Sequence, residues 1–259
     1  MDLLSHFHRE IEGFETAARA GASRLVPSCP GWAMSDLVLH LGGVHRFLTK
    51  LIDDRRTEPP APPDPADLGL PDDRDGWPAP GASTPAAEPM PATLIDWFAR
   101  GATALEARFR DRDPAEPVWT WSEEQTVGFW LRMQTIEAAV HRWDAQGASG
   151  EVRPVDAELA ADAVAQTFEI MAPARRARLG APAGAGETYG FRRTDGPGAW
   201  TVRFDGPDVR LATQAPDVEL SGTASDLMLW LWGRIPADRL DVQGDKAMLD
   251  RYFTLVPPL

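Results

Sequence analysis

Apolar residues recur at helical spacing in four stretches of the first 150 residues. In the first stretch, over residues 1–20, charged side chains separate the apolar set Leu4, Phe7, Ile11, Phe14 and Ala18. A second helix is predicted to begin at Ser35, a third to run from about Thr93 to Phe109, and a fourth from about Thr126 to Gln146, ended by Gly147. Four amphipathic helices in succession predict an antiparallel four-helix bundle, a fold that builds metal sites from inward-facing side chains.

The pattern is lost between the second and third helices and changes after the fourth. Residues Asp53 to Pro89 are rich in Pro, Asp, Gly and Ala without apolar periodicity, which predicts a long surface connection with little regular structure. After Gly150 a helix from Asp156 to about Ala174 precedes strand-like runs around a hairpin signal, Asp195-Gly-Pro-Gly198. The predicted strands are Thr188–Arg193, Trp200–Phe204, Val209–Thr213, Val218–Ser221 and Leu240–Val242, with further helices from Thr223 to Trp232 and from Asp245 to Phe253.

These patterns define an expected fold class, α plus α+β. A helical bundle over residues 1–150 is followed by a small α+β domain over residues 151–259.

The composition restricts the classes of partner. A net charge of −13 disfavours binding to phosphate backbones, and no run approaches the roughly 20 apolar residues of a membrane span, so we expect no nucleic acid and no membrane partner. We expect a cytoplasmic monomer or homodimer. The one cysteine, Cys29, rules out an intramolecular disulfide and a Cys-based zinc site, and is expected to be a partly buried thiol rather than a nucleophile. The basic cluster Arg175, Arg176 and Arg178 is expected to be a solvated helix end.

The candidate chemistry lies in the fourth predicted helix. Glu137 and His141 are four residues apart, so both side chains leave the same inward face, which also carries Trp130, Gln134 and Asp144. A buried carboxylate costs several kcal/mol, roughly, without a partner, so Glu137 must be paired, hydrogen-bonded or bound to a metal.

The residues alone leave these alternatives open. On the second helix His40 shares the apolar face, whereas His45 is about 140° away at ~100° per residue. Two histidines and a carboxylate are a recurrent ligand set for catalytic zinc and other divalent metals. Equally, Glu137 could bond only to His141, or pair with Arg132 or Arg142, while Asp144 could orient His141 or pair with an arginine.

Three sequence motifs resemble a known family. They are Val26-Pro-Ser-Cys-Pro-Gly-Trp32 with Asp36-Leu-Val-Leu-His40-Leu-Gly-Gly, then Glu137-Ala-Ala-Val-His141-Arg-Trp-Asp144, and in the second half Leu220-Ser-Gly-Thr-Ala-Ser-Asp-Leu-Met-Leu-Trp-Leu-Trp-Gly-Arg234. Together they look like the mycothiol-dependent maleylpyruvate isomerase family, part of the wider DinB-like superfamily with a sterol-carrier-like C-terminal domain. The resemblance covers nearly the whole chain.

This resemblance implies a site and an activity. It implies a divalent metal, Zn²⁺ or another such as Ni²⁺, held by His40, Glu137 and His141. It also implies mycothiol as a low-molecular-weight thiol cosubstrate and a small electrophilic substrate, which would be isomerised or would receive the sulfur. The substrate would lie in a cleft between the domains, and Arg203, Arg210 and Arg234 are the arginines that could bind it. The competing function is a non-catalytic binding protein for a small ligand, with a structural or vestigial metal site.

Overall fold

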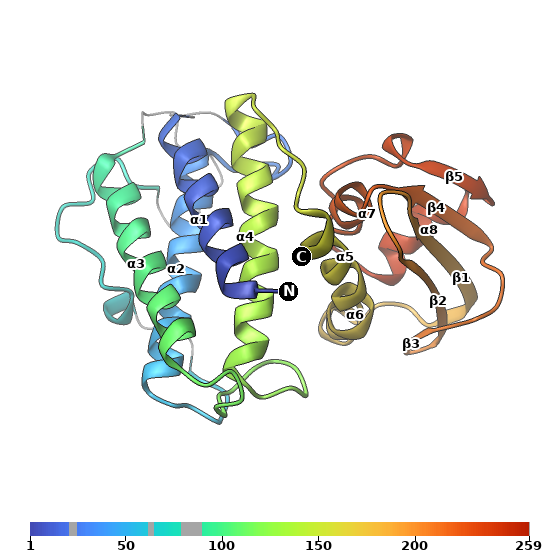
Figure 1. Ribbon diagram of the computed structural model, residues 1–259, viewed down its shortest axis with the longest axis horizontal. Helices are drawn as coiled ribbons and strands as arrows, with labels where there is room; N and C mark the ends of the chain where they lie inside the picture. Colours follow the sequence, from blue (N-terminus) through green and yellow to red (C-terminus); the bar gives the residue numbers. More distant parts are fainter. Residues whose placement is uncertain (21–24, 62–64, 79–89, 259) are drawn as a thin grey trace. The chain divides into compact units, whose positions relative to one another are not determined.

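The computed structural model describes residues 1–20, 25–61, 65–78 and 90–258, and the chain divides into two compact units, Met1–Arg153 and Pro154–Leu259 (Figure 1). The first unit is helical, and the second combines a five-stranded sheet with helices, so the expected fold class is confirmed. Among the described residues no helix has the length and apolar character needed to cross a membrane.

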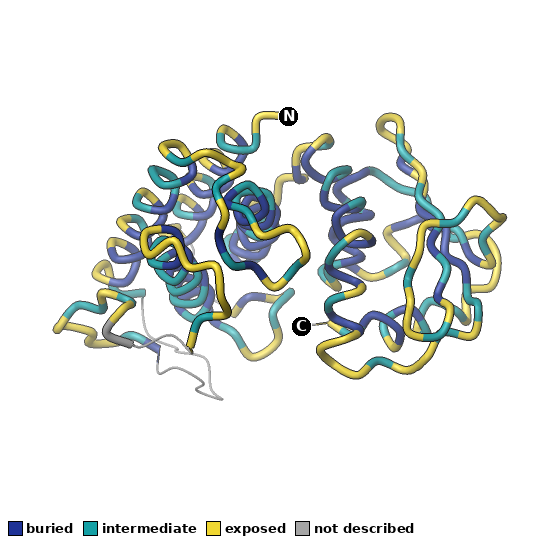
Figure 2. Tube along the Cα trace, turned by 90° about the horizontal axis from the view of Figure 1, so that it is seen from below, coloured by how far each residue is buried: buried dark blue, intermediate teal, exposed yellow. Residues whose placement is uncertain are grey.

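Four long helices build the first unit. They are α1 (Leu3–Ala20), α2 (Met34–Asp53), α3 (Ala92–Asp111) and α4 (Val127–Ser149). Helix α1 packs against α3 and α4, and α2 packs against the same two helices, with their buried positions turned inward (Figure 2). Gly42 lets α2 approach α3 closely, because a Cβ there would lie 2.3 Å from Cζ3 of Trp97. A 3-10 turn, Pro65–Leu68, lies in the long connection, and residues 62–64 and 79–89 of that predicted connection lie outside the described residues.

Helix α4 carries the candidate chemistry and is anchored at both ends. It begins where Thr126 Oγ1 accepts a hydrogen bond from the Phe129 amide. The prediction that Gly147 ends it is wrong. The helix continues to Ser149, and Gly150 ends it because its φ of 98° is a left-handed conformation that glycine adopts without a Cβ clash.

A buried ion pair joins α4 to α1. Arg142 Nε donates to Glu10 Oε2 at 2.6 Å, and both side chains are more than nine-tenths buried. This pairing excludes the alternative in which Arg142 neutralises Glu137, since the guanidinium is directed to the other helix.

The second unit begins with a long helical segment. Helix α5 (Ala157–Gln166) runs through a π-helical turn (Thr167–Met171) into α6 (Ala172–Leu179), five residues beyond the predicted end at Ala174. The sheet order is β3-β2-β1-β4-β5, with β1 and β4 parallel and the other neighbours antiparallel. The strands are β1 (Gly184–Arg193), β2 (Ala199–Gly206), β3 (Asp208–Leu211), β4 (Val218–Gly222) and β5 (Asp241–Gly244). The remaining helices are α7 (Ala224–Leu231), a 3-10 turn (Ala237–Arg239) and α8 (Met248–Leu255).

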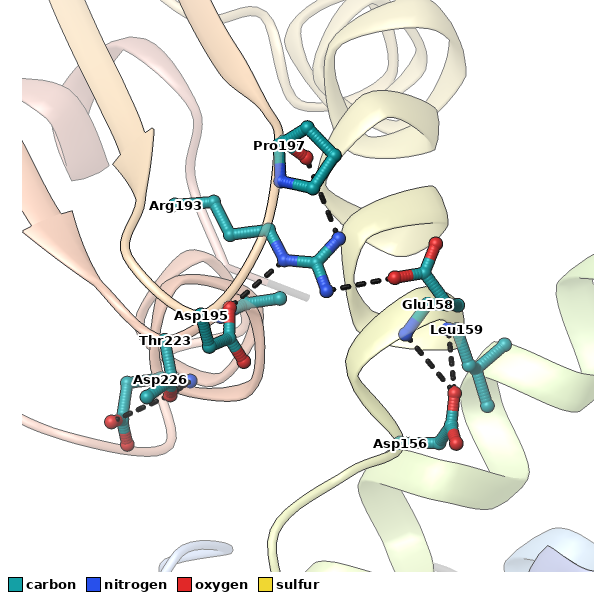
Figure 3. Close-up of polar contacts among 9 residues, drawn as sticks. Asp156, Glu158, Leu159, Arg193, Asp195, Pro197, Thr223 and Asp226 are labelled. Atoms are coloured by element: carbon teal, nitrogen blue, oxygen red, sulfur yellow. Dashed lines mark hydrogen bonds and ion pairs between the residues drawn. The ribbon is translucent and has the colours of Figure 1, made fainter.

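A buried arginine fixes the predicted β1–β2 hairpin. Arg193 donates to Asp195 Oδ1 and to Glu158 Oε1, each at 2.8 Å, so that the hairpin is tied to the start of α5 (Figure 3). Asp195 also accepts the backbone N–H of Ala224, the first residue of α7. One charge network therefore holds three elements together.

The expectation of a solvated basic helix end is wrong for two of its three arginines. Arg178 is exposed, but Arg175 and Arg176 are buried in α6. Arg176 tolerates burial because its guanidinium donates to four backbone carbonyl groups, those of Pro182, Gly206, Pro207 and Leu255.

Candidate metal centre

Three side chains predicted from the sequence meet between α2 and α4. His40 Nε2 lies 3.3 Å from Glu137 Oε1, and His141 Nε2 lies 3.8 Å from the same oxygen. One donor atom from each residue can be chosen so that all three lie within 4.8 Å of one another. The i, i+4 spacing on α4 places Glu137 beneath His141, and α2 supplies His40 from the facing helix, with its ring centroid 5.3 Å from that of His141.

His141 is held by a buried carboxylate. Its Nδ1 lies 3.0 Å from Oδ2 of Asp144, one helical turn further along α4, and the Asp144 side chain is fully buried. Asp144 in turn accepts a hydrogen bond from Ser28 Oγ at 2.5 Å and a weaker contact from Cys29 Sγ at 3.5 Å. The Asp144 carboxylate can only accept this hydrogen bond, so it favours the tautomer with the proton on Nδ1, and the lone pair of Nε2 then faces Glu137.

Glu137 is stabilised as an anion. Burial alone would raise the pKa of Glu137, but the His40 hydrogen bond and the charges of His141 and His40 outweigh it and lower the pKa to about 2. Gln134 also donates to Glu137 Oε2 at 2.6 Å, which leaves Oε1 as the oxygen that faces both histidines.

The two histidines of α2 are placed differently from expectation. His40 is 36% exposed, whereas His45, predicted to point away from the core, is completely buried between Phe7 and Phe98. The reason is that α2 is covered on more than one side, so its buried arc is wider than a single apolar stripe. Neither ring nitrogen of His45 has a hydrogen-bond partner among the described residues, and full burial lowers its pKa to about 3.

Two supporting residues had only a weak sequence signal. Ser28 lies directly before Cys29 in the segment Val26–Trp32, and of these two residues it is Ser28 that makes the shorter contact with Asp144. Trp32 packs its ring edge-on to His40, with ring centroids 5.2 Å apart. A contact between residues more than a hundred positions apart, such as Ser28 with Asp144, leaves no periodic trace in a single sequence.

The three candidate substrate arginines lie in the second unit and differ in their contacts. Arg203 and Arg210 occupy paired positions on β2 and β3, and exposed Arg210 bonds to Asp208. Arg234 follows α7 and donates to the backbone oxygen of Trp232 at 3.0 Å. These contacts do not distinguish one of the three as the substrate arginine.

Comparisons with known proteins agree on the fold. A crystal structure of the mycothiol-dependent maleylpyruvate isomerase superposes with a TM-score of 0.61 at 16% sequence identity, and the match covers 93% of this chain and 92% of that one. No match was found among curated proteins. Residues 4–146 match the mycothiol maleylpyruvate isomerase N-terminal domain, and residues 158–251 match the C-terminal domain of the same family. The chain therefore belongs to the mycothiol maleylpyruvate isomerase family.

Proposed function

We propose that this protein is a metal-dependent enzyme that acts on a small electrophilic substrate with the help of a low-molecular-weight thiol. His40, Glu137 and His141 would hold the divalent ion, Zn²⁺ or another such as Ni²⁺. The thiol would be mycothiol, as in the isomerase of known structure and in the name of the family. The observation that carries the proposal is the convergence of three donor atoms from two helices.

The donor set fits a divalent ion. Tetrahedral zinc with ligand bonds of about 2.0–2.1 Å places its donor atoms about 3.3 Å apart. The distances from Glu137 Oε1 to the two histidine nitrogens, 3.3 and 3.8 Å, are close to that separation. Three protein ligands leave one coordination position open, which is the composition of a catalytic rather than a structural site.

Residues around the site prepare its donor atoms. Asp144 keeps a proton on Nδ1 of His141, so that Nε2 is available as a donor. Gln134 fixes one oxygen of Glu137 and thereby orients the other. Cys29 is the one cysteine in the sequence, and its Sγ lies 3.5 Å from Asp144 Oδ2, so we assign the role of nucleophile to a small thiol and not to a cysteine of the chain.

When bound, the ion would stabilise the thiolate of the small thiol, a nucleophile able to add reversibly to a conjugated double bond. Reversible addition and elimination would return the thiol unchanged and give an isomerase. Addition without elimination would give an S-transferase. In either case we expect the substrate to be a small electrophilic molecule.

Metal content tests the site. Protein purified without added metal is expected to contain about one divalent ion per chain by elemental mass spectrometry, and His40→Ala and His141→Ala should lose it. His45→Phe is the matched control, because His45 lies on the same helix as His40 but its ring nitrogens have no hydrogen-bond partner among the described residues. Equal, negligible metal in wild type and His141→Ala would contradict the proposal and leave a purely polar pairing of the three side chains.

Turnover tests the reaction. The metal-loaded protein is incubated with small electrophiles, including maleylpyruvate, with and without mycothiol. We expect conversion that requires both the thiol and His40. Full metal occupancy with no thiol-dependent conversion across the panel would favour the non-catalytic binding protein instead.

A further inference from the structure

Arg175 is a buried cation without a hydrogen-bonding partner. It lies in α6 and is 6% exposed, and its Nε is fully buried. Within the part of the chain that the structure describes, its guanidinium makes no hydrogen bond and no ion pair. Its guanidinium lies over the Trp232 ring, whose centroid is 5.3 Å from Cζ. A cation–π contact recovers only part of the cost of burying a charge.

The neighbouring arginine shows what a structural role requires. Arg176 is also buried in α6, yet its nitrogens donate to four backbone carbonyl groups. Arg176 therefore holds loops and helix ends together. Arg175 has no such partners among the described residues, and its buried Nε is left as a donor without an acceptor.

Tyr252, on α8, presents a second unsatisfied donor. The side chain is completely buried, and its hydroxyl has no hydrogen-bond partner among the described residues. Burial raises the pKa of this hydroxyl above its usual range, and the positive charge of Arg175 acts in the opposite direction. Trp230 packs on Tyr252 with ring centroids 5.0 Å apart, and Trp232, just beyond α7, lies under Arg175.

The surroundings of these two donors are positive and aromatic. The groups whose charges act on the pKa of Arg175, beside its own burial, are Tyr252 and Arg234, and neither is a carboxylate. Arg234 adds a second positive charge to the region. Two tryptophan rings supply apolar surface beside the donors.

We propose that the Arg175 guanidinium and the Tyr252 hydroxyl bind the carboxylate of a small organic acid within the second unit. A planar guanidinium can donate to both oxygens of a carboxylate at once, and the lone pairs that remain on these oxygens can accept a hydrogen bond from the tyrosine hydroxyl. The aromatic rings suit the apolar part of the acid. This site depends on neither the metal nor the thiol of the proposed function.

The experiment measures carboxylate binding by metal-free full-length protein. Metal is removed with 1,10-phenanthroline, which carries no carboxylate, so that a carboxylate cannot bind through the ion. Acetate, butyrate and benzoate are titrated by calorimetry, each beside its amide as a neutral isostere. At least one acid is expected to bind tenfold or more tightly than its amide.

Three variants assign that binding to the site. Arg175→Met should reduce the affinity for the acid to that for the amide. Tyr252→Phe should weaken it about tenfold, which is the loss of one hydrogen bond to a charged group, without lowering the melting temperature of the free protein, since the deleted hydroxyl has no partner. Tyr189→Phe is the matched control, because the Tyr189 hydroxyl already donates to the Met248 carbonyl group, and it should leave the affinity within twofold.

Several results would overturn the proposal. They are the absence of carboxylate binding, equal affinity for acid and amide, and unchanged affinity in Tyr252→Phe. Binding of inorganic phosphate that depends on Arg175, without binding of the acids, would also overturn it. Loss of metal in the wild type would not affect this test, so failure here is distinct from failure of the proposed function.

Discussion

Replacing Asp144 by Asn tests whether this carboxylate prepares His141 as a ligand. The fully buried Asp144 side chain accepts from His141 Nδ1 at 3.0 Å and from Ser28 Oγ at 2.5 Å. An amide has only one oxygen to accept from these two donors. Its NH₂ group, itself a donor, would face the second of them and could not accept its hydrogen bond. Either His141 loses its partner, or it changes tautomer and carries the proton on Nε2, where it cannot bind an ion.

The structure indicates the size of this effect. One hydrogen bond to a charged group contributes about 1.5–3 kcal/mol, which corresponds to a roughly 10- to 100-fold weaker metal affinity. Competition with a chromophoric chelator measures the dissociation constant for Zn²⁺. Asp96→Asn is the control, since it removes the same charge from an exposed position on α3. Ser28→Ala should give a smaller weakening, because it removes one donor to Asp144 and leaves the carboxylate in place.

The reasoning would be refuted if Asp144→Asn folded normally, judged by its circular dichroism spectrum, and bound Zn²⁺ within twofold of the wild type. In that case the contact between Asp144 and His141 would serve the stability of α4 and not the donor atom at Nε2.

Two further predictions concern the bundle. Glu10→Gln should lower the free energy of unfolding by about 3–5 kcal/mol, because Arg142 loses its buried carboxylate partner, whereas Glu15→Gln at a more exposed ion pair should cost less than about 1 kcal/mol. Urea denaturation followed by circular dichroism compares the two, and equal losses would be inconsistent with a buried pair. His45→Phe should gain stability relative to wild type as pH falls from 6.5 towards 3. Between these pH values His45 is protonated in the unfolded wild type but stays neutral in the folded protein, where its pKa is about 3. The free energy of unfolding of the wild type therefore falls by up to about 1.4 kcal/mol per pH unit. Thermal melts at pH 7.5 and 5.5 measure this, and a difference between the two proteins that does not change with pH would argue against a neutral His45.

The helices and strands follow largely from local patterns. Apolar periodicity located all four bundle helices, and the turn chemistry of residues 195–198 located the β1–β2 hairpin. Helix ends were less predictable. Gly147 and Gly150 are chemically identical, and only the backbone conformation distinguishes the glycine inside α4 from the one that ends it. The α5–α6 segment extends to Leu179 because Arg176 is buried by tertiary contacts. The polar sequence near the end of α6 gives no indication of this burial.

The ligand candidates show where periodicity reaches its limit. The face of a helix predicts burial well when one side of the helix meets the core. On α4 this prediction was correct for Glu137 and His141, whose side chains both point inward. On α2 the same argument ranked His40 as more inward than His45, and the burial is the reverse. A residue that serves an open coordination position must reach solvent or substrate, so partial exposure of His40 is what its proposed role requires. Burial and the proposed function therefore select different histidines on one helix, and His40, the one implied by the family resemblance, is the less buried of the two.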